Sequence, residues 1–275
     1  MEFTALSWNL FHGRDFPPDP ALFTWRSRLL RVEERGPTHV QVNRDLQAEF
    51  ASVLAGSTWD VALLQECPPR YAIALADAGK ADAHRALTSR NSLGWLRAFA
   101  ARLNPDLIAS GEGGSNLTLV RPGGALGQIV ERREVAIHEG KPERRAMAFI
   151  RTGSGVCVAN LHATNDQPAL AVEDLRRAAA AATEWAGGSP LLFGGDLNLR
   201  PAEDPGTFEE LRERFGLAGS TAPRAIDHLL SRGLEVIEPP TQWIPERREL
   251  QRGGLALRLS DHAPVQASFN APTTG

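Results

Sequence analysis

Several short segments of the chain show the alternation of apolar and polar residues that predicts β-strands. Residues 3–9 (FTALSWN) are the first of these segments, and 60–66 (DVALLQE) has the apolar centre of a buried strand. Further strands are predicted at about 117–120, 128–137, 146–152, 155–161, 190–194, 226–230, 234–238 and 263–269. The pattern therefore predicts a large β-sheet component.

Helical periodicity appears between these strands. Five apolar residues of 42–54 fall on one helical stripe: Val42, Leu46, Phe50, Val53 and Leu54. The clearest helix is predicted over 168–186, where Pro168 suits the first turn, alanine fills the middle and two glycines follow. Shorter helices are predicted after Pro68–Pro69, near 92–103 and at 207–215.

Residues of about 12–40 are predicted to form a proline-rich insertion that contains a short helix around 22–35. Strands occur both in pairs and separated by helices, which indicates a mixed α/β sheet system with helices outside it. We see no internal repeat and no linker between domains, so we expect a single domain over residues 1–275. We also expect a monomer.

Composition and charge restrict the possible partners. Hydrophobic residues make up 42% of the chain and charged residues 23%, as in a globular protein with a real core. The net charge of −3 gives no general attraction to nucleic acid, so a polyanion would need a local basic patch. Of the 30 basic residues, only Lys80 and Lys141 are lysine. The arginine pairs at 132–133, 144–145 and 247–248 are expected on solvated edges.

Other features bear on the cell compartment. Cys67 and Cys157 are the only cysteines, have no metal-type spacing and are expected to be buried thiols. The N-terminal segment resembles a strand rather than a signal peptide, and no apolar run has the length of a membrane helix. We therefore expect a cytoplasmic protein without a membrane span.

Polar residues accumulate where the predicted strands end. The segment GGDLNLRP at 194–201 follows an apolar strand, and strand alternation would point Asp196 and Asn198 to the same side. Comparable residues stand at the other strand ends: Asn9, Glu66, His162, Asp227 with His228, and Asp261 with His262. A rigid sheet holds such groups in place, so we expect them to converge on one site.

The residue types in this set indicate a reaction. Carboxylates with amides and no cysteine ligand suit Mg²⁺ or Mn²⁺ rather than zinc. Such ions hold phosphate oxygens, and a histidine oriented by a carboxylate transfers protons near neutral pH. The set therefore predicts metal-assisted hydrolysis of a phosphate ester.

Six segments in this order resemble the motifs of the endonuclease/exonuclease/phosphatase superfamily, the deoxyribonuclease-I-like phosphodiesterases. They are SWNL, DVALLQE, NLHAT, GGDLN, IDHLL and LSDHAPV, and they span residues 7 to about 266. The resemblance implies a four-layer sandwich of two packed mixed β-sheets with helices on both outer faces. It also implies one or two divalent ions.

The resemblance further implies roles for individual residues. Glu66 would be the main metal ligand, with Asn9 beside it and Asp261 near the ion. Asp196 would position or deprotonate the attacking water, and Asn198 would donate to the scissile phosphate. His262 and Asp227 would form an acid–base dyad. His162 would donate to the phosphate or protonate the leaving group.

Three further residues are considered for the site. Asn116 could approach the substrate phosphate or cap the start of a strand. His228 is expected to be structural, and His12 either borders the site or lies on the surface.

The substrate remains open at this point. The histidine at 162, where abasic-site endonucleases of the superfamily carry tyrosine, favours the branch with deoxyribonucleases, sphingomyelinases and inositol-phosphate phosphatases. Members that act on membranes would present exposed apolar loops, and none is evident. The insertion interleaves aromatic residues with arginines, so it could bind nucleic acid or form a lid. We favour a nuclease on DNA or RNA. The alternatives are a phosphatase or phosphodiesterase of a small metabolite or lipid headgroup and, less favoured, an idle binding module.

Overall fold

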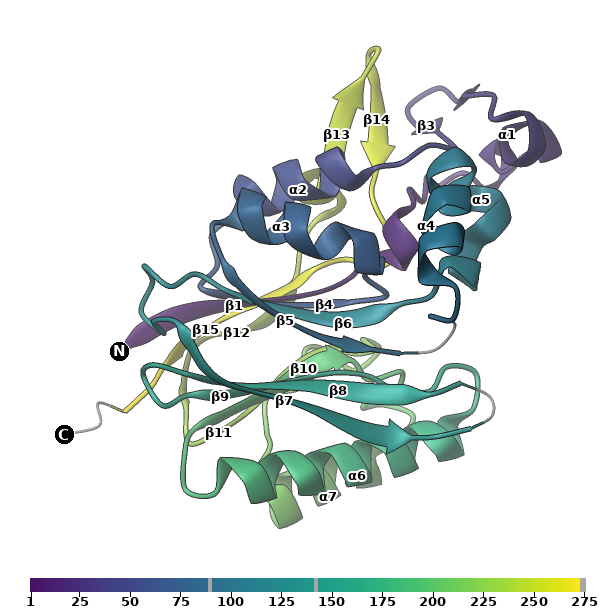
Figure 1. Ribbon diagram of the computed structural model, residues 1–275. Coiled ribbons are helices and arrows are strands. Elements are labelled where there is room, and N and C mark those ends of the chain that lie inside the picture. Colours follow the sequence, from purple (N-terminus) through teal and green to yellow (C-terminus); the bar gives the residue numbers. More distant parts are fainter. Residues whose placement is uncertain (89–90, 141–142, 273–275) are drawn as a thin grey trace.

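Two β-sheets pack face to face in the computed structural model, which describes residues 1–88, 91–140 and 143–272 (Figure 1). The six-stranded sheet has the order β12 (Glu235–Gln242), β15 (Val265–Asn270), β1 (Glu2–Asn9), β4 (Val61–Gln65), β6 (Ser115–Val120) and β5 (Asp82–Leu87). The five-stranded sheet has the order β11 (Asp227–Arg232), β10 (Leu191–Asp196), β9 (Cys157–His162), β8 (Arg145–Thr152) and β7 (Ile129–His138).

Each sheet is mixed and contains one parallel pair among antiparallel neighbours. In the six-stranded sheet the parallel pair is β1 with β4, and in the five-stranded sheet it is β9 with β10. The carboxyl ends of parallel strands lie at the same edge of a sheet, so each pair brings two strand ends together.

Helices cover the outer face of each sheet. The helices α2 (Gln47–Ala55) and α3 (Ala72–Gly79) lie over the six-stranded sheet, while α6 (Pro168–Ala186) and α7 (Pro205–Phe215) lie over the other (Figure 1). This arrangement confirms the expected four-layer sandwich. A further group, α1 (Trp25–Leu30), α4 (Gly94–Leu103) and α5 (Pro105–Ile108), lies beside the end of the layers.

The remaining elements are short. Two small antiparallel pairs are β2 (Glu34–Arg35) with β3 (Val40–Gln41) and β13 (Glu249–Arg252) with β14 (Leu255–Arg258). The 3-10 turns are η1 (Phe11–Gly13), η2 (Pro20–Leu22), η3 (Pro69–Tyr71), η4 (Ala109–Glu112) and η5 (Pro245–Arg248).

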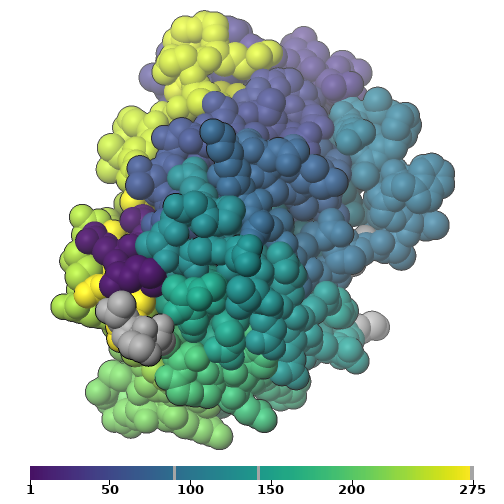
Figure 2. Space-filling view, turned by 60° about the vertical axis from the view of Figure 1, so that its left-hand side comes forward, coloured from purple at the N-terminus to yellow at the C-terminus, as the bar shows by residue number. Residues whose placement is uncertain are grey.

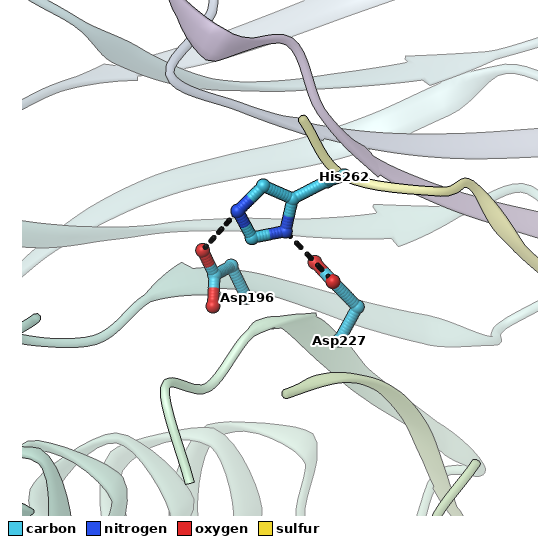
Figure 3. Close-up of side chains that lie close together, drawn as sticks. All are labelled: Asp196, Asp227 and His262. Atoms are coloured by element: carbon cyan, nitrogen blue, oxygen red, sulfur yellow. Dashed lines mark hydrogen bonds and ion pairs between the residues drawn. The ribbon is translucent and has the colours of Figure 1, made fainter. Parts of the chain in front are cut away.

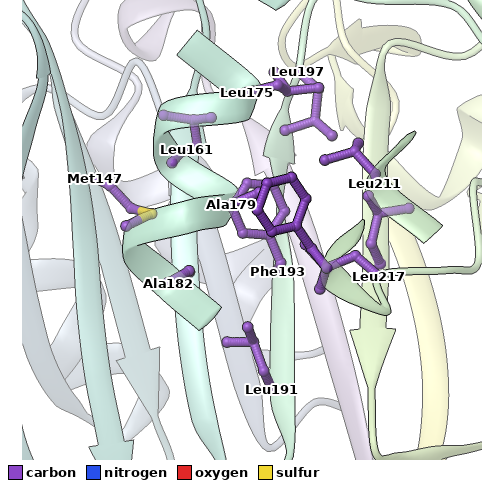
Figure 4. Packing of buried hydrophobic residues seen from close by; sticks show 14 of the residues in the cluster. Met147, Leu161, Leu175, Ala179, Ala182, Leu191, Phe193, Leu197, Leu211 and Leu217 are labelled. Atoms are coloured by element: carbon purple, nitrogen blue, oxygen red, sulfur yellow. The ribbon is translucent and has the colours of Figure 1, made fainter. Parts of the chain in front are cut away.

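Three large apolar cores and a small cluster of Ala86, Ala146 and Ala148 hold the layers together. One lies between the sheets and includes Phe3, Leu63 and Phe269. A second joins the five-stranded sheet to α6 and α7, where Phe193 packs near Leu175 and Leu211 (Figure 4). The third joins the six-stranded sheet to α2 and α3. The two cysteines are buried and unpaired, as expected.

Some predicted boundaries were wrong. Helix α2 begins at Gln47 instead of 42, because the carboxylate of Asp45 accepts a hydrogen bond from the Gln47 backbone and Val40–Gln41 pair as a strand. The helix predicted at 22–35 is confined to Trp25–Leu30, since Thr24 caps its start and Arg31 adopts a left-handed conformation at its end. Strands β5, β13 and β14 were not predicted.

Candidate functional site

A row of three polar side chains crosses neighbouring strands of the five-stranded sheet. In the register of these strands Asp196 lies opposite His162 on one side and opposite Asp227 on the other. Residues that face each other across strands project from the same face of the sheet. The last residues of β9 and β10 and the first residue of β11 thus form one continuous polar edge.

His262 completes this row from the loop before β15. Its Nδ1 atom lies 2.8 Å from Oδ2 of Asp227, and its Nε2 atom lies 3.8 Å from Oδ2 of Asp196 (Figure 3). Burial by itself would lower the pKa of His262, but Asp227 and Asp196 outweigh this effect and raise the pKa well above its usual value. The imidazole is therefore held as a cation between two carboxyl groups.

The loop that carries His262 is fixed by backbone contacts. Ser260 donates its hydroxyl to the Asn9 carbonyl at 2.6 Å and accepts from the His262 backbone at 3.0 Å. The indole of Trp8 donates to the His262 carbonyl at 3.1 Å. Buried Arg248 donates to the carbonyls of Ser260 and His262, which contradicts the expected solvated position of its arginine pair.

Asp196 lies at the centre of the site. Its Oδ2 atom accepts from the Asn9 side-chain amide at 2.9 Å and lies 3.5 Å from Nε2 of His162. Burial raises the pKa of Asp196 to about 7, with the charge of Asp227 acting in the same direction. A carboxyl group with such a pKa can exchange a proton at neutral pH.

The two glycines before Asp196 are required by close packing. A Cβ atom on Gly195 would lie 1.9 Å from the Leu161 carbonyl oxygen, and Gly195 has φ +131°. A Cβ atom on Gly194 would lie 2.5 Å from the His228 carbonyl oxygen. The GGD segment thus lets β10 pass between its neighbours and bring Asp196 to the edge of the sheet.

Glu66 follows β4 in a left-handed conformation with φ +46°, which is unfavourable for a residue with a side chain. Its carboxylate lies 3.2 Å from Nε2 of His12 and 3.9 Å from Nε2 of His162. Strain of this kind persists only where the surroundings enforce it, and here it directs a partly exposed carboxylate toward two histidines.

His162 has a defined tautomer because of its neighbour Arg145. The Arg145 guanidinium can only donate, and its Nη1 atom lies 3.3 Å from Nδ1 of His162, so Nδ1 is the acceptor. Burial, together with the charge of Arg145, lowers the pKa of His162 well below its usual value. The neutral ring therefore presents its Nε2–H toward Asp196 and Glu66.

Asn198 does not follow the strand alternation that was predicted for it. Strand β10 ends at Asp196, and Asn198 has φ +52°. Its backbone N–H donates to Oδ1 of Asp196 at 3.1 Å, and its side chain donates to the Ala163 carbonyl at 3.0 Å. The segment after Asp196 is thus a tight turn stabilised by the Asp196 carboxylate.

Two other sequence candidates are buried away from solvent. Asn116 donates to the Ala146 carbonyl of β8 at 2.7 Å and links the two sheets. His228 accepts from the Thr221 backbone at 3.1 Å and lies 3.2 Å from the Leu199 carbonyl, as expected for a structural histidine.

Asp261 is the most exposed of the candidate site residues, and its Oδ1 atom lies 3.9 Å from Nε2 of His262.

Two groups of side chains offer ligands for a cation. In the described residues, atoms of Asp196, Asp227 and His262 lie within 4.8 Å of one another. Glu66 and Asp261 form the more exposed group, and burial with the charge of Glu66 raises the pKa of Asp261. A cation beside these two carboxylates would relieve their repulsion, so the donor set fits a hard divalent ion.

A cavity of about 360 Å³ adjoins the candidate site. It is lined mainly by the insertion and α5: Phe11, Arg14, Asp15, Phe16, Phe23, Thr24, Ser27, Arg28, Asp106 and Ala109. Burial lowers the pKa of the Arg14 guanidinium, while Asp106 of the cavity and Glu66 and Asp261 of the centre oppose that effect. Arg14 thus interacts electrostatically with both the cavity and the candidate site.

Three residues of the site were not predicted from the sequence. The sequence allowed two positions for His12, predicted an exposed edge for Arg145 and gave no role for Arg14. A small cavity lined by His12, Glu66, Arg145 and His162 shows that two of them belong to the centre. The run HGR directly after SWNLF was the available signal for His12 and Arg14, because it extends a strand end already identified.

The fold and the site define a two-sheet protein of the deoxyribonuclease-I-like class. A model of the endonuclease/exonuclease/phosphatase family matches residues 6–262. The chain therefore belongs to the endonuclease/exonuclease/phosphatase family, and this membership supports a phosphate-ester hydrolase as the class of activity. No curated protein matches the sequence significantly.

Solved structures of the family have the same fold. A Bacteroides thetaiotaomicron endonuclease/exonuclease/phosphatase family protein has a TM-score of 0.64 at 14% identity, with 99% of this chain and 98% of that chain covered. A mannosyl-6-phosphatase from the same organism has a TM-score of 0.64 at 16% identity, covering 97% and 99%. Truncated TDP2 from Caenorhabditis elegans has a TM-score of 0.58 at 15% identity, covering 98% of both chains.

Proposed function

We propose that the protein is a Mg²⁺- or Mn²⁺-dependent phosphoesterase that hydrolyses the phosphate ester of a small molecule or a lipid headgroup. The observation that carries this proposal is the convergence of three groups on Oδ2 of Asp196. Asn9 donates to this oxygen at 2.9 Å, and the Nε2 atoms of His162 and His262 lie 3.5 Å and 3.8 Å from it. A buried carboxyl group surrounded by such partners is suited to orient and deprotonate a water molecule.

Glu66 and Asp261 are the residues that would hold the divalent ion, with the Asn9 amide oxygen nearby. When bound, the ion would supply neutralisation of phosphate charge and stabilisation of the leaving oxygen. The tighter group of Asp196, Asp227 and His262 is already committed to internal hydrogen bonds. We therefore assign that group to proton handling.

The reaction we propose is an in-line displacement at phosphorus. Asp196 takes a proton from water, the water oxygen attacks phosphorus, and the bond from phosphorus to the ester oxygen breaks. The attacking and leaving oxygens lie on opposite sides of phosphorus. The Nε2 atom of His262 lies 3.8 Å from Oδ2 of Asp196, so His262 is on the side of the attacking water. The leaving oxygen takes its proton from solvent. His162 and Arg145 bind the phosphoryl oxygens, and Asn198 also contributes a donor near Asp196.

Three features favour a small ester over a polynucleotide. The adjoining cavity of about 360 Å³ has the size of a small-molecule site. Carboxylates stand at the rim of the centre, since the Asp261 and Glu143 side chains are 29% and 22% exposed. The net charge of −3 adds no long-range attraction for a polyanion.

Nucleic-acid hydrolysis is the second candidate function. It is favoured by the exposed aromatic side chains of Phe23 and Trp25, which stand beside Arg26 and Arg28 in the insertion. Aromatic rings and arginines in this combination bind single-stranded nucleic acid.

A substrate panel separates the two functions. Purified protein is incubated with p-nitrophenyl phosphate, bis(p-nitrophenyl) phosphate, phosphorylated sugars and plasmid DNA, in Mg²⁺ or Mn²⁺ and with an EDTA control. We expect metal-dependent release of product from the small esters, lost in His262→Ala. Nicking of plasmid as the dominant metal-dependent activity would favour the nuclease. Turnover of no ester by the folded protein would contradict the proposal.

A further inference from the structure

Large apolar side chains gather on the exposed faces of α1, α4 and α5. We name this surface the apolar ridge, and it consists of Trp25, Leu29, Leu30, Leu93, Trp95, Leu96, Phe99, Leu103 and Leu107. Their exposed fractions lie between 47% and 77%, and they are nine of the sixteen large hydrophobic residues exposed in the described residues. A concentration of this kind marks a contact surface.

The three helices that carry the ridge lie together (Figure 1). On α4, Trp95, Phe99 and Leu103 follow one another at four-residue spacing and so share one face of the helix. Asn104 joins α4 to α5 and donates to the Arg28 carbonyl at 2.9 Å, which ties α1 to this junction. In Figure 1 the three helices lie together at one end of the molecule, and in Figure 2 the segment of α4 and α5 projects from its right-hand side.

Arginines are the charged residues of α1 and α4, the two helices that carry most of the ridge. Helices α1 and α4 contain no aspartate or glutamate. Exposed arginines accompany the apolar side chains: Arg26, Arg28, Arg31 and Arg102. The acidic residue of α5, Asp106, is half-buried and accepts from the Gln41 amide at 2.7 Å. Exposed tryptophan and leucine with flanking arginine form the pattern that lies in the interface of an anionic membrane.

We propose that the apolar ridge docks the protein on the surface of an anionic lipid bilayer. Helix α4 has ten residues, and no helix in the described part of the chain is long and apolar enough to span a membrane, so the ridge lies on the bilayer. A second copy of the chain is disfavoured, because a two-fold contact would set the same arginines against each other. Nucleic acid is disfavoured because six of the nine ridge residues are leucines, which offer no ring on which a base can stack.

The ridge also borders the cavity beside the catalytic centre. Phe23 and Arg28 line this cavity, while Trp25 and Leu29 of the same segment belong to the ridge. Docking through the ridge would therefore bring the cavity next to lipid headgroups. The docking proposal itself does not depend on the proposed hydrolase activity, since binding can be measured without turnover.

Sedimentation with vesicles tests the proposal. The full chain is mixed with vesicles of phosphatidylcholine alone or of phosphatidylcholine with phosphatidylglycerol, at low and at high salt. We expect binding to the anionic vesicles that weakens with salt. The double variant Trp95→Ser, Phe99→Ser should lower the partition coefficient by about tenfold or more. The matched control Ile73→Ser, at an apolar residue of α3 that is 77% exposed, should leave binding unchanged.

A charge-reversal variant provides a second test of the proposal. Arg26→Glu with Arg102→Glu should lower binding to anionic vesicles, while Arg212→Glu on α7, whose side chain is 59% exposed, should not. Circular dichroism confirms that each variant is folded. Absence of binding to anionic vesicles would overturn the proposal. Binding by the Trp95→Ser, Phe99→Ser variant and by the Arg26→Glu, Arg102→Glu variant that equals wild-type binding would also overturn it. A concentration-dependent dimer abolished by Trp95→Ser, without vesicle binding, would instead assign the ridge to a second copy.

Discussion

The Nδ1 atom of His262 lies 2.8 Å from Oδ2 of Asp227, within hydrogen-bonding distance, with Asp227 buried and His262 partly exposed at the edge of the sheet. The two residues come from different segments, since Asp227 begins β11 and His262 lies in the loop before β15. This contact fixes the direction of the imidazole, so that its Nε2 atom faces Asp196 and Asp261. The orientation of His262 therefore depends on the Asp227 carboxylate.

Replacing this carboxylate should disable the centre without removing a side chain. In Asp227→Asn the amide keeps the shape of the carboxyl group but loses its charge and one acceptor. We expect kcat for p-nitrophenyl phosphate to fall by about 10²-fold or more, because the imidazole loses both its orientation and its positive charge. A folded Asp227→Asn protein with the wild-type kcat would remove this pair from the mechanism.

Arg145 should act on substrate binding. Its guanidinium is buried beside His162, whereas the neighbouring Arg144 is partly exposed and pairs with Glu134. Arg145→Gln should raise KM by about tenfold or more while kcat changes less, since a phosphate loses a charged hydrogen-bond donor. Arg144→Gln provides the control and should retain the wild-type KM. Equal KM values in all three proteins would contradict this role.

Gly195 should tolerate no side chain. In Gly195→Ala the new Cβ atom would lie 1.9 Å from the Leu161 carbonyl oxygen, at a residue with φ +131°. We expect the free energy of unfolding to fall by more than about 4 kcal/mol, or the variant to be insoluble. Gly188→Ala is the control, because its Cβ would meet no atom within 4 Å, and it should change the free energy by less than about 0.5 kcal/mol. Urea denaturation measures both.

Asp15 should make stability depend on pH. Burial raises the pKa of this carboxyl group from 3.8 to about 8. The folded protein thus binds the Asp15 proton more tightly than the unfolded chain does, and this residue weakens folding as the pH rises from about 4 to about 8.

Asp15→Asn removes this titration, while the other titrating groups are common to both proteins. The difference in the free energy of unfolding, variant minus wild type, should therefore rise by on the order of 2 kcal/mol between about pH 5 and about pH 8. Thermal unfolding of the two proteins over this pH range provides the measurement. A difference that stays constant with pH, or falls, would show that Asp15 is ionised in the folded protein.

The sequence was most informative at the strand ends. Asn9, Glu66, His162 and Asp196 were each recognised as polar residues that terminate apolar strands, and the two parallel strand pairs place them together. The pairing of His262 with Asp227 rather than with its neighbours was also anticipated, and His228 has the structural contacts expected of it. These features depend on short-range pattern and on strand topology, which the sequence encodes directly.

Other features depend on tertiary packing that no local pattern encodes. His12 contacts Glu66 because both residues adopt left-handed backbone conformations, with φ +52° and +46°. Arg145 faces inward because of its place at the start of β8, whereas Arg144, one residue earlier, does not. Helix α4 has an ordinary apolar stripe, and no exposed apolar loop was evident from the sequence. The ridge is recognised only from the exposure of these side chains in the structure.

The most direct test of the account is the rate of phosphate release from p-nitrophenyl phosphate in saturating Mg²⁺, compared among wild type, Glu66→Gln and His262→Asn. Glu66 represents the proposed metal site and His262 the cation beside the proposed base Asp196, so loss of either should remove transition-state stabilisation. We predict metal-dependent turnover by wild type that EDTA abolishes, with kcat/KM lower by about 10²-fold or more in each folded variant. Turnover that survives EDTA and both substitutions at the wild-type rate would place the chemistry elsewhere and contradict the account.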